Sequence, residues 1–189
     1  MNESKGMQLG AVLAATLQLF VVFASTPASA YEDTGLKWAG TSTEYGWDWW
    51  GSIPSDWKPA IREAASTWNA AGSTFRFSED YWTSNIYKDQ LAADKQAETT
   101  TTVYTWDPNT IIDVETVFNS NLEWSTTGNP APWQSDVQDV ATHEFGHWLK
   151  LGETPDEWTN TMYNEGWGTI GRRTLEQDDI DGIIHIYGT

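Results

Sequence analysis

Cysteine is missing from this chain of 189 residues, and histidine and basic residues are scarce. Without cysteine no disulfide can form, so the fold must be held by packing and by any metal that it binds. There are 10 lysines and arginines against 27 aspartates and glutamates, which gives a net charge of −17. This charge repels nucleic-acid phosphates and argues against a nucleic-acid partner. It is compatible with calcium bound at carboxylates, although it locates no such site.

The longest apolar run spans Leu9–Phe23 and is followed by small residues that end at Ala30. This pattern predicts a secretory signal peptide, residues 1–30, that is cut after Ala30. A membrane anchor is the alternative, but the run contains polar residues and falls short of the ~20 apolar residues that span a bilayer. We therefore expect one secreted, monomeric domain, residues 31–189, without membrane contact after signal cleavage.

Tryptophan, in contrast to cysteine and histidine, is abundant in this chain. All 13 tryptophans follow residue 30. Packing in a core or a cleft is the common use of this side chain, and we expect that use here. A surface that stacks against sugars is the alternative.

Apolar spacing predicts three helices and several strands. The first helix is capped by Ser55, or begins nearer to Pro59, and ends at Gly72; the second is capped by Ser135 and runs to Leu149. The third opens with a capping-box pattern of Thr174 and Gln177. Strands are predicted over Leu36–Ala39, Thr74–Phe77, Thr99–Trp106 and Ile111–Phe118, with a loop or broken helix between Ser78 and Gln96. Together these elements predict an α+β domain or a three-layer α/β domain.

The most informative motif is HExxH, at residues 143–147. On a helix this spacing puts His143 and His147 one turn apart on the same face. Both rings can then bind one Zn²⁺ at ~2.0–2.1 Å. Glu144 is badly placed to bind the same ion, but it can take a proton from a water bound there. A chance match is the alternative, and the scarcity of histidine argues against it.

Three motifs in this order resemble the matrixin-type metzincin zinc proteases. They are HEFGHWLKLGE at residues 143–153, Thr161-Met162-Tyr163, which resembles the Met-turn, and LEQDDIDGIIHIYG at residues 175–188, which resembles the closing helix. The resemblance covers most of the chain after residue 30. It implies a metzincin-like domain with a twisted mixed sheet, a long helix in the N-terminal half, an active-site helix and a C-terminal helix.

The resemblance also assigns structural roles around the expected metal site. Met162 would pack beneath the imidazoles and give the site a dry, adaptable base. Asp178 or Asp179 would tie the closing helix to the Met-turn backbone. The alternative for these two acids is that they simply favour the first turn of their helix.

Two positions depart from the family pattern, which has glycine at 150 and histidine or aspartate at 153. A left-handed turn at Lys150 would cost about 1 kcal/mol, unless the turn moves to Gly152. We expect Glu153 to be the third zinc ligand, because two histidines and one glutamate serve in other zinc peptidases. The alternatives are Glu165, Asp156 or Glu157, His185, or no third protein ligand.

We therefore expect a secreted zinc metalloendopeptidase, with His143, His147 and Glu153 as metal ligands. Glu144 would be the general base acting on a metal-bound water. An extended peptide or protein substrate would add to an edge strand, for which Ile112–Phe118 is the candidate. The alternative is a catalytically weak or inactive binding module that keeps the metzincin frame, because residues 150 and 153 both differ from the family pattern.

Overall fold

The computed structural model describes residues 35–154, 158–164 and 166–189. The predicted signal peptide therefore lies outside the described residues, and so do Asp156, Glu157 and Glu165. Within the described part of the chain, no helix is long and apolar enough to cross a membrane.

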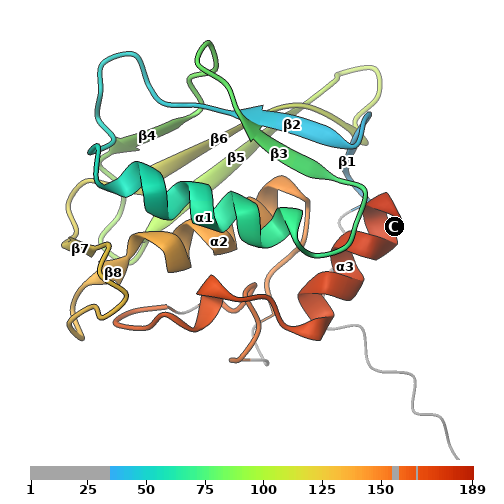
Figure 1. Ribbon diagram of the computed structural model, residues 1–189. Coiled ribbons are helices and arrows are strands. Elements are labelled where there is room, and N and C mark those ends of the chain that lie inside the picture. Colours follow the sequence, from blue (N-terminus) through green and yellow to red (C-terminus); the bar gives the residue numbers. More distant parts are fainter. Residues whose placement is uncertain (1–34, 155–157, 165) are drawn as a thin grey trace, which may run out of the picture.

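A four-stranded mixed sheet forms one layer of the domain, with β6 at its centre (Figure 1). β5 runs antiparallel to β6, from Ala97 opposite Phe118 to Val103 opposite Ile111. β1 and β4 pair with β6 in parallel, and β2 and β3 form a separate parallel pair. The strands of these two sheets are β1 (Lys37–Trp38), β2 (Ser42–Tyr45), β3 (Arg76–Glu79), β4 (Ile86–Asp89), β5 (Ala97–Val103) and β6 (Thr110–Asn119).

The prediction that Ile112–Phe118 is an edge strand is wrong. These residues belong to β6, which has paired strands on both of its sides. β5 pairs only with β6 among the described strands, so β5 is an edge strand on its side of the sheet. β6 is rich in β-branched residues and is largely buried, which fits this interior position, whereas the threonine-rich β5 alternates between half-buried and exposed residues.

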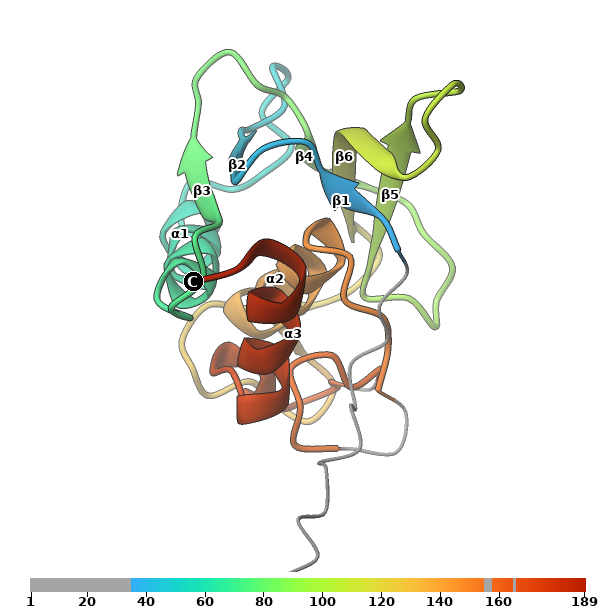
Figure 2. The same ribbon diagram turned by 90° about the vertical axis from the view of Figure 1, so that its right-hand side faces the viewer.

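Two helices pack against each other and against the sheet (Figures 1 and 2). α1 spans Trp57–Asn69 and α2 spans Val137–Trp148. Trp68 of α1 is fully buried and donates from Nε1 to the carbonyl of Thr142 on α2, at 2.8 Å. This core of aromatic and aliphatic side chains fixes α2 beneath the sheet.

The remaining elements complete the side of the domain away from the sheet (Figure 2). They are a short parallel pair, β7 (Trp124–Ser125) and β8 (Ser135–Asp136), the 3-10 helix η1 (Gly171–Arg173) and the closing helix α3 (Gln177–Tyr187). The predicted α+β architecture with three helices and a mixed sheet is confirmed.

The predicted helix caps are each displaced along the chain. Asp56, not Ser55, precedes α1, and its side chain makes no capping bond; Pro59 falls in the first turn, where a backbone N–H has no helical partner anyway. Asp136 caps α2 by accepting from the Asp139 N–H at 3.0 Å. The capping box of α3 is formed by Glu176 and Asp179 rather than by Thr174 and Gln177.

The segment between Ser78 and Gln96 is more regular than predicted. It contains the end of β3 and all of β4. β4 is only four residues long, and its partner β6 lies far along the chain. The sequence therefore has no alternation of apolar and polar residues long enough to predict this strand. β2 was not predicted for the same reason: its sequence Ser-Thr-Glu-Tyr is short and polar.

Two ion pairs connect η1 to the start of α2. The Nε of Arg172 bonds to Asp139 at 2.8 Å, and the Arg173 guanidinium bonds both carboxylate oxygens of Asp136, at 2.8 and 2.6 Å. Both aspartates are fully buried. Removing one partner of such a pair leaves an uncompensated buried charge, which costs about 3–5 kcal/mol.

Candidate metal centre

The two histidines of the HExxH motif lie one turn apart on α2, as the spacing predicts. Their Nε2 atoms are 3.2 Å apart. Nδ1 of His143 lies 2.8 Å from the carbonyl oxygen of Thr161, and Nδ1 of His147 lies 3.0 Å from that of Leu151. A carbonyl only accepts, so both Nδ1 atoms carry the proton. In its neutral form each ring then presents an Nε2 lone pair to the same point.

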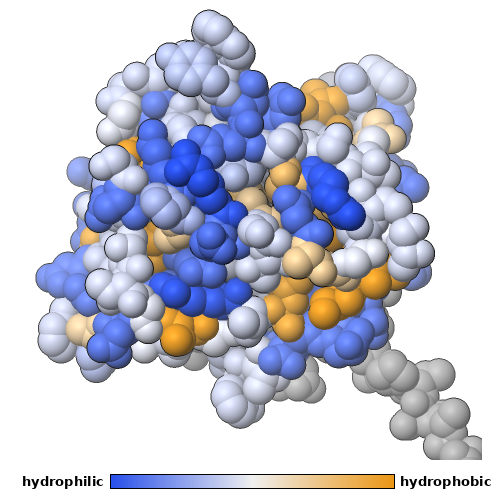
Figure 3. Space-filling model, in the orientation of Figure 1, coloured by the Kyte–Doolittle hydropathy of each residue, from blue (hydrophilic) through white to orange (hydrophobic). Residues whose placement is uncertain are grey.

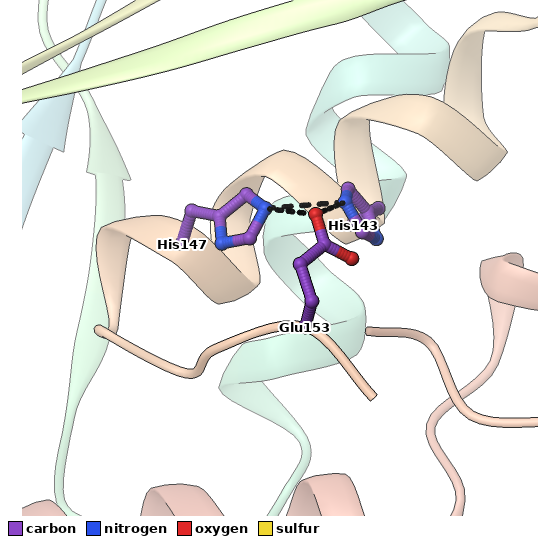
Figure 4. Close-up of side chains that lie close together, drawn as sticks. All are labelled: His143, His147 and Glu153. Carbon is purple, nitrogen blue, oxygen red and sulfur yellow. Dashed lines mark hydrogen bonds and ion pairs between the residues drawn. The ribbon is translucent and has the colours of Figure 1, made fainter. Parts of the chain in front are cut away.

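Glu153 brings a third ligand atom to this point, from the segment that follows α2 (Figure 4). Its Oε1 lies 3.4 Å from Nε2 of His147 and 3.6 Å from Nε2 of His143. Ligand atoms ~2.0–2.1 Å from a tetrahedral zinc ion are about 3.3 Å apart, so these separations suit one ion. Three acceptor atoms this close repel one another unless a cation or a proton lies among them.

The pKa values of Glu153 and His147 are shifted because these side chains lie so close together. Burial opposes ionisation of Glu153, but the nearby rings of His143 and His147 outweigh it and lower the pKa of Glu153 to about 2. Burial also opposes protonation of His147, yet Glu153 and Glu144 together raise its pKa above the usual 6.5. The carboxylates therefore favour positive charge at this place, as a cation site requires.

The backbone reaches Glu153 through a left-handed turn at Lys150. Lys150 has φ of +70° and is the only residue other than glycine with positive φ in the described part of the chain. Of the two predicted alternatives, the turn at Lys150 is correct and the turn at Gly152 is wrong. The Lys150 ammonium bonds the hydroxyl of Thr101 on β5, which joins this turn to the edge strand.

Glu144 is held by hydroxyl groups that sequence reasoning did not single out. The Thr99 hydroxyl on β5 donates to Oε2 of Glu144 at 2.5 Å, and it lies 2.8 Å from the Thr116 hydroxyl on β6. Trp148 Nε1 donates to Thr116 at 2.8 Å. Indole only donates and a carboxylate only accepts, so the chain of donors runs from Trp148 to Thr116, to Thr99 and to Glu144.

Met162 packs against α2 at Gly146, next to the histidine pair. It is fully buried, and its sulfur would lie 2.1 Å from a Cβ at Gly146, the residue before His147. Any larger residue at 146 would therefore displace the thioether. Asp179 accepts from the Thr161 N–H at 3.0 Å, which ties α3 to this turn. The predicted tie from Asp178 or Asp179 is confirmed for Asp179; that Met162 forms a base beneath the imidazoles stays a prediction.

These groups face a cleft of about 460 Å³ between α2 and the start of β5. Its lining includes Glu144 and the three converging side chains, and residues 94–99 form the rim on the side of β5. α2 thus lines one side of the cleft. An extended chain entering this cleft would meet β5, the edge strand.

His185 does not join the cluster. It is exposed on α3 and lines a different hollow, with Gly35 and Leu36. In the described part of the chain, His143, His147 and Glu153 are the one group of three or more such side chains gathered closely enough to hold a metal ion. The other predicted alternatives, Asp156, Glu157 and Glu165, lie outside the described residues.

The family model for matrixins, the peptidase family M10, matches residues 52–188, from the loop before α1 to the end of α3. The chain therefore belongs to the matrixin family. The predicted resemblance is confirmed by a match that covers most of the described residues.

Individual relatives agree with this assignment. Metalloendoproteinase 1 of Glycine max is 30% identical over 149 residues, which are 72% of this chain and 47% of that protein. Matrix metalloproteinase-25 of Homo sapiens is 35% identical over 79 residues, 41% of this chain and 14% of that protein. Interstitial collagenase of Bos taurus is 43% identical over 61 residues, 30% and 13% respectively. The chain thus spans less than half the length of these relatives.

Proposed function

We propose that this matrixin is a secreted, zinc-dependent endopeptidase with His143, His147 and Glu153 as its metal ligands. The observation that carries the proposal is the convergence of two Nε2 atoms and one carboxylate oxygen within 3.2–3.6 Å of one another. Two imidazoles and a carboxylate are a donor set suited to zinc. Export rests on the predicted signal peptide, residues 1–30.

Glu144 is the proposed general base. When bound, zinc supplies a Lewis acid that polarises the scissile carbonyl and makes water a stronger acid. Glu144 lines the same cleft, takes the proton of the attacking water and passes it to the leaving amine. The Thr99 hydroxyl fixes Oε2, so the rotation of the carboxylate is restricted and the other oxygen is left to accept the proton.

The proposed substrate is an extended peptide or a segment of a protein. β5 is the edge of the sheet and borders the cleft, so a peptide can pair with its outer backbone groups. The half-buried threonines of β5 lie on the same face of the strand. One of them, Thr99, donates a hydrogen bond to the proposed base, Glu144. A substrate paired with β5 therefore lies beside Glu144.

Hydrolysis of casein or gelatin by the purified protein tests this function. Chelation should abolish turnover and added zinc should restore it. Glu144→Gln should keep one zinc per chain and lose turnover, because it removes the base and leaves the three ligands. Hydrolysis that survives chelation, or an unchanged rate in Glu144→Gln, would overturn the mechanism. A folded, inert protein that binds no zinc would favour the binding-module alternative.

A further inference from the structure

Three large aromatic side chains gather on the surface at a place that the metal centre does not use. Trp49 lies in the loop between β2 and α1, and Tyr81 and Trp82 lie in the loop between β3 and β4; we call these three the aromatic patch. They are 58%, 76% and 75% exposed. The second loop projects from the top of the molecule, where Figure 3 shows side chains of intermediate hydropathy standing clear of the body.

The rings of the aromatic patch contact one another. The centroid of Trp49 lies 6.0 Å from that of Tyr81 and 6.1 Å from that of Trp82, and the centroids of Tyr81 and Trp82 are 5.1 Å apart. These contacts keep the rings together without burying them. Exposed apolar clusters of this kind mark interaction sites more often than scattered single residues do.

The two loops that carry the patch are locked together by their backbones. A Cβ at Gly46 would lie 2.2 Å from the carbonyl oxygen of Thr83 and 2.5 Å from that of Asp80, so only glycine permits this approach. Buried Asn85 accepts from the Gly46 N–H at 3.0 Å and donates to the Glu44 carbonyl at 3.2 Å. The two loops are therefore in direct backbone contact at Gly46.

Each loop is also fixed internally by one aspartate. Asp48, which is buried, accepts from the N–H and the hydroxyl of Ser52 at 2.7 and 2.9 Å. Asp80 accepts from the Trp82 N–H at 2.8 Å and the Thr83 hydroxyl at 3.0 Å. The aromatic rings thus stand on a rigid base, and a ligand would lose little free energy in ordering them.

The charges around the patch disfavour an anionic ligand. Asp48 and Asp80 are committed to their loops, and Glu79 is paired with Arg62 at 2.6 Å. The net charge of −17 repels polyanions such as nucleic acids and acidic lipids. None of the three side chains of the patch carries a charge, so the patch itself offers no ionic group to a ligand.

The composition of the patch favours a sugar over a protein surface. It holds only tryptophan and tyrosine, with no aliphatic side chain to fill the grooves of an apolar partner. Aromatic faces carry partial negative charge, which attracts the slightly positive C–H groups on the face of a sugar ring. The indole N–H and the phenol O–H at the ring edges can bond to sugar hydroxyls.

We propose that the aromatic patch binds a neutral polysaccharide, whose sugar rings stack on Trp49, Tyr81 and Trp82. None of the three lines the cleft at the metal centre, so a bound polymer leaves the cleft open to peptide. The site would hold the protein on an insoluble neutral glycan. This inference does not depend on whether the chain cleaves peptides.

Sedimentation with insoluble cellulose and with insoluble chitin tests the proposal. The purified protein should be depleted from solution by at least one of these polymers. Tyr81→Ala combined with Trp82→Ala should weaken binding by about tenfold or more, since two stacking faces are lost. Trp133→Ala is the matched control: Trp133 is 67% exposed but lies outside the patch, so binding should not change.

Three results would overturn the proposal. One is no depletion by either neutral polymer; another is equal binding by wild type and the double variant. The third is a wild-type protein that is a dimer by light scattering and a double variant that is a monomer. The patch would then be a contact between copies of the chain. Thermal unfolding of both variants shows whether the fold is kept, and Trp49→Ala, which alters the other loop, provides an independent variant.

Discussion

Oδ2 of Asp179 lies 3.0 Å from the backbone nitrogen of Thr161. The carbonyl of the same Thr161 accepts from Nδ1 of His143 at 2.8 Å. One residue of the Met-turn therefore connects the closing helix to a proposed metal ligand. Asp179 also caps α3 by accepting from the Glu176 N–H at 2.9 Å, so its carboxylate serves both the helix and the metal centre.

Asp179→Ala should lower both the stability and the zinc affinity of the protein. The change leaves buried donors without partners, which costs about 1–3 kcal/mol. It also frees the Thr161 carbonyl to shift away from His143. Asp181→Ala is the control, because Asp181 is exposed on the same helix and accepts from the side chain of Gln177. Denaturant unfolding and zinc titration measure the two effects; equal behaviour of both variants would contradict this role.

Glu153→Ala should weaken zinc binding by about 100-fold or more, because a third of the protein ligand set is lost. Glu153→His should retain zinc with a neutral third ligand and shift hydrolysis to lower pH. Glu98→Ala is the matched control, since Glu98 lines the same cleft but pairs with Lys95 at 2.5 Å instead of with the histidines. Wild-type zinc affinity in Glu153→Ala would show that Glu153 is not a ligand.

Thr99→Val should lower kcat about tenfold and leave KM nearly unchanged. Valine keeps the shape of threonine and its preference for strands, but it removes the donor to Oε2 of Glu144. Thr99→Ser restores the hydroxyl and should recover most of the rate. Zinc content should be the same in all three proteins. A change in KM alone would assign Thr99 to substrate binding instead.

Lys150→Gly should be more stable than Lys150→Ala by about 1 kcal/mol. Both variants lose the ammonium bonded to Thr101, so the difference between them isolates the left-handed backbone at φ of +70°. Urea unfolding of the two variants measures the difference. Equal stability would show that the turn relaxes when the lysine side chain is removed.

The metal-free protein should draw the most stability from its histidine–glutamate cluster between pH 4.5 and 6.5. The pKa of Glu153 is lowered to about 2 in the fold, so its contribution is present above 4.5 and is lost as the pH falls. The pKa of His147 is raised above 6.5, so its contribution is present below 6.5 and is lost as the pH rises through the raised value.

This effect can be isolated by comparing the free energy of unfolding of the wild type and of Glu153→Gln, both freed of metal by a chelator, at pH values within and on both sides of this window. The difference between the two stabilities should peak inside the window, because only the wild type has the charged carboxylate. Saturating zinc should remove the peak by keeping both histidines neutral. A difference that is flat with pH would contradict the coupling.

The sequence predicts the parts of the molecule that have a local signature. Helical spacing locates α1, α2 and α3 to within a few residues, and HExxH places His143 and His147 on one face. Glu153 was predicted as a ligand because it occupies the position of the family's third ligand. In the structure its carboxylate lies beside the rings of His143 and His147. The caps were displaced because several adjacent polar residues compete for each position, and the backbone geometry decides among them.

Contacts between distant segments were not predictable in the same way. The bond from Thr99 to Glu144 joins residues 45 apart, and four consecutive threonines in β5 give no reason to choose one. The same holds for the edge position of β5, which depends on where β1 and β4 pair with β6. The close approach of Gly46 to the loop after β3 also appears only in three dimensions.

The Arg172–Asp139 and Arg173–Asp136 pairs close a long loop of chain that begins with the HExxH helix and includes Glu153 and Met162. A disulfide closes such a loop in many proteins of oxidising compartments, but this chain has no cysteine. Thiols and disulfides therefore cannot break this closure. The two ion pairs can open and re-form without thiol–disulfide exchange. The same fold should survive in reducing and in oxidising surroundings alike.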